Sequence, residues 1–229
     1  EPYFLDRDLS AGGDLFHIRR NNQDQSSYDE RTTGFTLRMG YPLSEELRQR
    51  LNYTLQQSEI TNVPSTASRF IQSQAGKSLT SIIGQELSYD TRDSKLDPTE
   101  GFVARLNTDF AGLGGSRKFA RVRVGATQYY PITEKFILST AGEVGYIKGL
   151  EGQGVKISDR FFLGGDTLRG FEFAGVGPRD QTASADDALG GTRFVRGSLE
   201  LTHPAPLSPE LGLKLHVFGD IGILSKSGE

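Results

Sequence analysis

The sequence predicts an all-β protein, specifically part of an antiparallel up-and-down transmembrane β-barrel. Three observations support this prediction. About nine segments alternate apolar and polar residues with a period of two, their lengths match the roughly 9 to 11 residues that a tilted strand needs to cross a bilayer, and the connections between them alternate between short turns and long loops. The composition agrees, because 14 Phe, 8 Tyr and 28 Gly favour strands and turns over helices.

Length, charge and cysteine content narrow the class of protein. A chain of 229 residues can form one large β domain or two small ones. A net charge of -3 provides no basic surface for a nucleic acid, so we expect no nucleic-acid partner. No apolar run is long enough for a transmembrane helix. The absence of cysteine excludes disulfides and thiolate chemistry.

The first four predicted strands each place apolar residues on one face. The segment 9–19 is mixed, with leucine, alanine and glycine on the face that also carries a histidine. The segment 33–41 alternates strictly until Pro42 ends it. The segments 47–55 and 79–89 repeat the pattern, with leucine, isoleucine and tyrosine on one face and charged, amide or hydroxyl side chains on the other.

The remaining five predicted strands follow the same rule. The segment 102–110 is the clearest, because one face is apolar and the other carries charges of both signs. Strands 120–130 and 136–147 flank a proline turn, and strands 191–203 and 211–224 follow the longest connection. A β-sandwich is the alternative fold, but its strands are usually only about 5 or 6 residues long.

The connections differ in length at the two ends of the strands. Short turns and long loops on opposite ends are typical of outer-membrane barrels. The short turns are 42–45, 90–100, 131–134 and 204–209, the long loops are 20–30, 60–77 and 148–190, and 112–116 is a short exception. Because bacterial barrels have an even strand number and no open edge in lipid, we expect 1–229 to be a partial C-terminal β-barrel domain without its closing strands.

The long loop at 148–190 contains the most informative stretch, 160–178, which is too rich in phenylalanine to be disordered. Within it, Arg169 stands between apolar residues and is followed by glycine. This pattern indicates a charge that a loop folded inward delivers to an acidic partner. The alternative is a surface turn with a solvated arginine.

Glu200 and Asp220 are the candidate partners of that arginine. Both fall on the polar faces of consecutive strands, so both carboxylates should point into the barrel. A guanidinium group could pair with the two together. The alternative is that other arginines on polar strand faces neutralise them. Those are Arg105, Arg121, Arg123 and Arg196.

The stretch 162–171, Phe-Leu-Gly-Gly-Asp-Thr-Leu-Arg-Gly-Phe, resembles the Val-Arg-Gly-Phe loop motif of the BamA superfamily of outer-membrane assembly barrels, also called the bacterial surface antigen D15 family. Leu168 replaces the more common valine. Four further segments are similar to the family and occur in the same order. They are 1–4, 175–178, 198–201 and 218–222.

The resemblance implies a structural role for the motif. In that family the loop folds into the lumen and its arginine contacts acidic residues of the next two strands, which corresponds to Arg169 with Glu200 and Asp220. Gly170 would let the loop approach the wall, and Phe171 would anchor it. The resemblance covers the middle of the family's barrel and omits its POTRA repeats.

The resemblance also implies a function. The complete protein would fold and insert β-barrel precursors into the bacterial outer membrane. Its partners would be unfolded outer-membrane protein precursors, accessory assembly lipoproteins and the lipid bilayer, and it would need no cofactor. The alternatives are a two-partner secretion transporter or another translocation barrel of the same superfamily, a passive porin, or a soluble β-rich binding domain.

Other chemistry finds little support in the residues. His17, His203 and His216 are scattered without metal-ligand spacing, so we expect no metal site. No serine or threonine lies in a motif that would activate it as a nucleophile. We therefore expect a protein that is not an enzyme.

Overall fold

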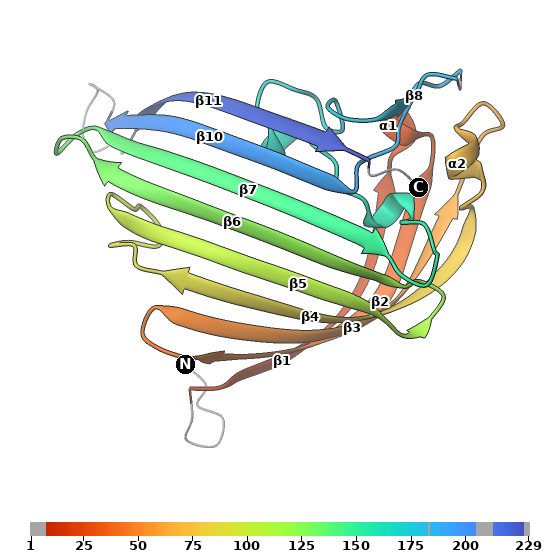
Figure 1. Ribbon diagram of the computed structural model, residues 1–229, viewed down its shortest axis with the longest axis horizontal. Coiled ribbons are helices and arrows are strands. Elements are labelled where there is room, and N and C mark those ends of the chain that lie inside the picture. Colours follow the sequence, from red (N-terminus) through yellow and green to blue (C-terminus); the bar gives the residue numbers. More distant parts are fainter. Residues whose placement is uncertain (1–7, 183, 205–212, 227–229) are drawn as a thin grey trace.

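A computed structural model describes residues 8–182, 184–204 and 213–226. Nine of the described strands form one antiparallel sheet in the order β1-β2-β3-β4-β5-β6-β7-β10-β11, which confirms the predicted fold class (Figure 1). The strands of this sheet are β1 (Ser10–Asn21), β2 (Asp29–Pro42), β3 (Leu47–Thr61), β4 (Gly76–Asp90), β5 (Gly101–Gly115), β6 (Phe119–Pro131), β7 (Ile137–Gly149), β10 (Arg193–Pro204) and β11 (Lys214–Ser225).

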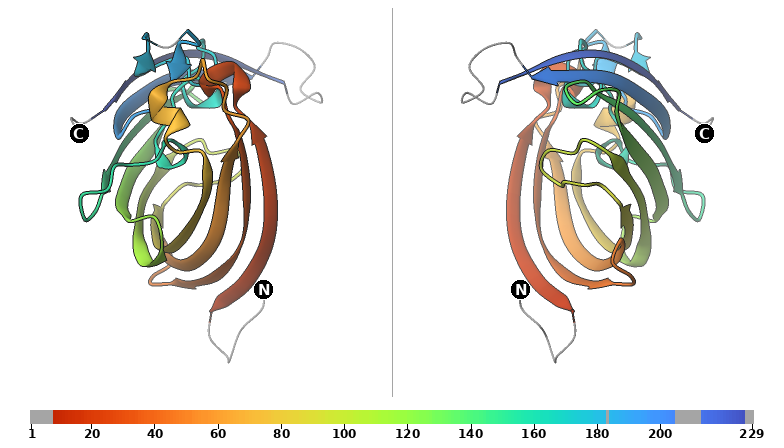
Figure 2. Two further views of the ribbon diagram at one scale, coloured as in Figure 1. Left: turned by 90° about the vertical axis from the view of Figure 1, so that its right-hand side faces the viewer. Right: turned by 90° about the vertical axis from the view of Figure 1, so that its left-hand side faces the viewer.

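The sheet curves into an open trough in which β1 and β11 are the two edge strands (Figure 2). The small elements lie in the connections. They are α1 (Gln23–Ser26), α2 (Arg69–Gln72), the two-residue pair β8 (Arg179–Asp180) and β9 (Asp187–Ala188), and the 3₁₀ turns Ile157–Asp159 and Gly165–Thr167. No helix in the described ranges is long and apolar enough to cross a membrane.

Every strand of the main sheet pairs with the next one in the chain, apart from the jump from β7 to β10 over the long loop, residues 150–192. The long loops, α1, α2 and the short β5–β6 connection lie at one end of the strands, and the other short turns lie at the opposite end (Figure 1). The predicted turn at 204–209 and the start of the strand 211–224 fall largely outside the described residues, as does the segment 1–4.

The strands extend further toward the long-loop end than the hydrophobic pattern indicates. Strand β2 already begins at Asp29, β3 continues to Thr61 and β5 continues to Gly115. The segments predicted as loops at 20–30 and 60–77 therefore each lose two residues at either end to strands, and four of the five residues at 112–116 belong to β5. Backbone pairing continues where side chains are polar on both faces, and in that region the alternation that marks a strand in the sequence disappears.

The two faces of the sheet differ in polarity as the alternation predicts. On the face turned away from the long loop, large apolar side chains are exposed, among them Leu15 (89%), Val217 (72%) and Ile221 (72%). The opposite face carries Arg105, Asn107 and other polar side chains that line a cavity. An apolar outer face of this extent is typical of a surface that contacts lipid or another protein.

The buried core lies at the long-loop end, between the loops and the concave face of the sheet. One cluster joins Ile82, Phe119 and Ile147 of the strands to Val155 of the long loop. A second joins Tyr28, Ile60 and Ile71 to Ile157, and a third packs Leu163 against Phe194 and Leu224. The long loop therefore contributes to each of the three clusters and is an integral part of the fold.

The carboxylate of Asp93 orders the middle of the β4–β5 turn. Its Oδ1 accepts hydrogen bonds from the backbone N–H groups of Thr99 (2.9 Å) and Glu100 (3.2 Å), and its Oδ2 accepts one from the Thr99 hydroxyl (2.6 Å). These hydrogen bonds to the charged form hold the pKa of the Asp93 carboxyl at about 2.

We predict that this turn loosens in strong acid. The pKa of Asp93 in the folded protein, about 2, lies below the value of about 3.9 expected in the unfolded chain. The ionised carboxylate therefore contributes its full stabilisation above the unfolded pKa, and this stabilisation is lost as the pH falls through about 2. Carboxyl ¹³C shifts of the full-length protein, with Asp93→Asn to assign the resonance, should show this midpoint. A midpoint at or above the unfolded value would contradict the prediction.

Candidate functional site

The candidate site lies where the middle of the long loop meets the concave face of β10 and β11. Here Leu168 is almost fully buried (2% exposed). A Cβ added to Gly222 of β11 would lie 3.2 Å from Leu168 Cδ1, so the absence of a side chain at that position leaves room for the leucine. This apolar contact brings the following residue, Arg169, against the wall of the sheet.

Glycine at two positions permits the shape of this segment. Gly164 has a φ of +125°, and a Cβ there would lie 1.8 Å from the carbonyl oxygen of Glu172. Gly170, directly after the arginine, has a φ of +88°. L-residues with a side chain rarely adopt such φ values, so the glycines predicted by the motif fit the turn that returns the chain from the wall.

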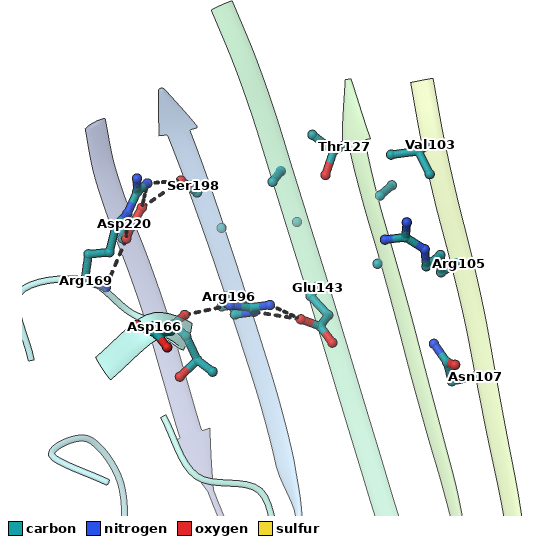
Figure 3. A pocket seen from close by; sticks show the side chains of 16 residues that line it. Val103, Arg105, Asn107, Thr127, Glu143, Asp166, Arg169, Arg196, Ser198 and Asp220 are labelled. Carbon is teal, nitrogen blue, oxygen red and sulfur yellow. Dashed lines mark hydrogen bonds and ion pairs between the residues drawn. The ribbon is translucent and has the colours of Figure 1, made fainter. Parts of the chain in front are cut away.

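Arg169 contacts both predicted acceptors. Its backbone N–H (3.1 Å) and Nε (2.8 Å) donate to Asp220 Oδ2, and its Nη2 donates to Asp220 Oδ1 (2.7 Å). Its Nη1 donates to Glu200 Oε2. We call Arg169 with Ser198, Glu200 and Asp220 the arginine lock; Figure 3 shows the contacts of Arg169 with Asp220 and Ser198.

Neighbouring side chains complete the arginine lock. The Ser198 hydroxyl accepts a hydrogen bond from Arg169 Nη2 (2.8 Å) and donates one to Asp220 Oδ1 (2.7 Å). The Arg169 guanidinium carbon lies 3.6 Å from the centroid of the Phe218 ring, a cation–π contact. His216 Nδ1 lies 2.9 Å from the second oxygen of Glu200.

The electrostatics of the lock favour a permanent charge pair. The Asp220 side chain is 8% exposed and the Arg169 side chain 34% exposed. Hydrogen bonds to Asp220 and then to Glu200 raise the pKa of Arg169 above its ordinary value, so the guanidinium stays charged. The arrangement is suited to holding a loop in place, since both oxygens of Asp220 and one oxygen of Glu200 accept hydrogen bonds from Arg169.

A second arginine holds the segment just before the lock. Arg196 of β10 donates from Nε to Glu143 Oε2 of β7 (2.7 Å), a contact drawn in Figure 3. Its Nη1 donates to the Thr167 carbonyl oxygen (2.8 Å). Beside these contacts lies a polar cavity of about 470 Å³, bounded by the loop and by strands β5, β6, β7, β10 and β11. The loop therefore occupies part of the concave side and leaves part of it open.

The structure places the predicted residues as follows. Arg169 is the arginine that pairs with Glu200 and Asp220. Two of the alternative arginines pair elsewhere, since Arg196 binds Glu143 and Arg121 binds Asp109. Leu168 is the buried apolar residue of the motif. Phe171 is 52% exposed, and its contribution to the turn is its backbone carbonyl, which accepts from Gly165 N–H (2.7 Å).

Several residues make contacts that were not predicted from the sequence. Ser198, Phe218 and the pair Arg196–Glu143 all lie on polar strand faces, so alternation alone could identify them as inward but could not show that they contact the loop. His216 also faces Glu200, as a hydrogen-bond partner. Within the described ranges, no group of three or more histidine or acidic side chains could hold a metal ion.

A family model and the sequences of known proteins match this chain, and the matches agree with one another. The Omp85 superfamily domain matches residues 1–229. The outer membrane protein assembly factor BamA of Neorickettsia risticii is 34% identical over 96% of this chain, and that of Nitratidesulfovibrio vulgaris is 31% identical over 97%. The sorting and assembly machinery component 50 homolog of Mus musculus is 30% identical over 72%.

A solved structure shares the fold. A crystal structure of BamA from Haemophilus ducreyi, lacking POTRA domains 1–3, superposes with a TM-score of 0.85 and 24% sequence identity, covering 99% of this chain and 48% of that one. The chain spans only 30% and 28% of the length of the two bacterial relatives.

Proposed function

Because the chain belongs to the Omp85 superfamily, we propose that the protein of which it is part folds β-barrel precursors and inserts them into the bacterial outer membrane. The observation that carries the proposal is the identity along almost the whole chain to proteins named as outer membrane assembly factors. The role is non-enzymatic and requires no cofactor.

Physical chemistry explains why such a role suits a barrel. Unpaired strand backbone is costly in hydrocarbon, so a precursor enters a bilayer more readily beside a protein that presents strand edges and disturbs the lipid. The exposed apolar face of the sheet is the surface that would contact the bilayer. The partners of the protein would then be unfolded outer-membrane precursors, accessory assembly lipoproteins and lipid.

The 229 residues are, on this proposal, part of a larger C-terminal barrel in a protein that also carries POTRA repeats. The fraction of the relatives' length that the chain spans supports this assignment. The arginine lock would keep the long loop, residues 150–192, inside the lumen. A passive porin, by contrast, would show steady conductance through a lumen that the loop does not close.

Depletion of the full-length protein in its host tests the function. We expect the folded forms of several unrelated outer-membrane barrels to fall together, with precursors accumulating in the periplasm. Heat-resistant folded bands on gels, measured for each barrel during depletion, provide the readout. If the barrels stay at normal levels and one secreted protein disappears, the protein is a translocation barrel of the same superfamily and the assembly proposal is wrong.

A further inference from the structure

A second buried carboxylate holds the far part of the long loop, and it contacts loops at the opposite side of the trough. The Asp187 side chain in β9 is almost fully buried, at 1% exposed. Its Oδ1 accepts from the Ser27 hydroxyl (2.6 Å), and its Oδ2 accepts from the backbone N–H of Ser68 (2.6 Å). We call Asp187 with Ser27 and Ser68 the aspartate lock.

The partners of Asp187 belong to two different connections. Ser27 follows α1 between β1 and β2, and Ser68 caps α2 between β3 and β4. Further hydrogen bonds support the same junction: the Ser26 hydroxyl donates to the Ala188 carbonyl oxygen (2.8 Å), and the Ser68 hydroxyl donates to Asp180 Oδ2 (2.5 Å). One loop is thus joined to two others through polar contacts, of which those of Asp187 and Ala188 are buried.

Apolar packing strengthens this junction. Ile157, Phe162 and Leu189 of the long loop pack in one cluster with side chains of the other two connections and of the adjoining strand end. The backbone N–H of Ile157 also donates to Gln74 Oε1 (2.8 Å), beyond α2. Both halves of the long loop are therefore attached to the connections of β1 to β4.

The arginine lock and the aspartate lock attach the same loop to different parts of the sheet. The arginine lock contacts β10 and β11, and the aspartate lock contacts the connections of the first four strands. Along the sheet, β5, β6 and β7 separate these two parts. Figure 2 shows the loop segments above the curved sheet, between its two edges.

We propose that the long loop is a brace across the trough, and that Asp187 is the positioning residue that fixes this brace to strands β1 to β4. The brace sets the position of β1–β4 relative to β10–β11, and release of either lock lets these two parts of the sheet move apart or together. The brace is independent of which client the barrel serves.

Distances between spin labels in the full-length protein in lipid nanodiscs test the brace. One label replaces the exposed Leu37 of β2, and the other replaces the exposed Val195 of β10, so that both labels report on the sheet and not on a loop. We expect a narrow distance distribution in the parent protein and one at least twice as wide with Asp187→Ala. Arg169→Ala should widen the same distribution, because a brace needs both of its ends.

Two variants serve as matched controls. Asp187→Asn keeps the shape of the side chain: its amide oxygen can accept from Ser68 N–H and its amide nitrogen can donate to the Ser27 hydroxyl, so the distribution should stay narrow. Asp24→Ala makes the same change at an exposed position in α1 and should have no effect. If Asp187→Ala does not fold, Ser27→Gly replaces it in the test, because this change removes one hydrogen bond to Asp187. Ser27 has a φ of +52°, which glycine adopts readily. The width of the distance distribution should then lie between those of the parent protein and Asp187→Ala.

The brace is wrong if Asp187→Ala, or Ser27→Gly in its place, leaves the Leu37–Val195 distribution unchanged. A second label pair, the exposed Thr66 beside α2 with the exposed Gln181 of the long loop, shows whether the lock itself has opened. Widening of this second pair alone would mean that Asp187 orders the loops locally without holding the two parts of the sheet, and would also overturn the brace.

Discussion

Arg169→Ala is expected to destabilise the folded barrel by about 3 kcal/mol and to release the long loop from the lumen wall. Removing one partner of a buried ion pair leaves the other charge without compensation, and Asp220, at 8% exposed, would retain only Ser198. The expected loss is at the low end of the range for buried pairs, because the Arg169 side chain is 34% exposed and water can replace part of its interaction with Glu200.

Two measurements on the full-length protein check this prediction: the temperature at which the folded band is lost on gels, and protease resistance of the loop. Arg123→Ala is the matched control, since Arg123 is an exposed arginine of β6 outside the lock. Arg169→Lys keeps the charge but not the forked geometry and should fall in between. Unchanged heat resistance and an intact loop in Arg169→Ala would show that the lock has no structural role.

Asp159→Ala is expected to cost about 3 to 5 kcal/mol of unfolding free energy. Arg117, between β5 and β6, is 2% exposed and donates from Nη2 to Asp159 and to the Ser158 hydroxyl (2.6 Å). Its Nε has no hydrogen-bond partner within the described residues. Removing the carboxylate would therefore leave a buried guanidinium group with only hydroxyl acceptors.

A double variant distinguishes the contribution of the two charges from that of the volume that the two side chains fill. Arg117→Met with Asp159→Leu removes both charges and keeps apolar volume, so it should lose less stability than Asp159→Ala alone. Urea unfolding of the full-length protein in lipid vesicles gives both values. The control is Glu151→Ala, whose side chain is 66% exposed beside Lys118 and whose loss should cost no more than about 0.5 kcal/mol. A double variant less stable than the single one would contradict the prediction.

The alternation of side chains made much of the fold predictable. A period of two fixes the face to which each strand residue belongs, so the inward direction of Glu200 and Asp220 and the number of strands followed from the sequence. The glycine after Arg169 was expected to let the loop approach the wall; in the structure its positive φ is what requires a glycine there, since an added Cβ would meet nothing within 4 Å.

Strand ends and loop partners were not predictable from the residues alone. Backbone pairing at Asp29 or Thr61 continues without an apolar pattern, so the sequence shows no signal there. The hydrogen bonds of Asp187 join residues 160 and 119 positions apart, and nothing local in the sequence of a loop indicates such partners.

The sequence by itself determined that this protein is an antiparallel barrel sheet with one apolar face and an inward-facing pair of carboxylates. Only the tertiary structure decided which arginine meets them, and that the same loop is also held by Arg117 and by the aspartate lock. The physical reason is that periodicity reports the direction of a side chain relative to its own strand. Its depth and its partner depend on how the loop packs across the curved sheet.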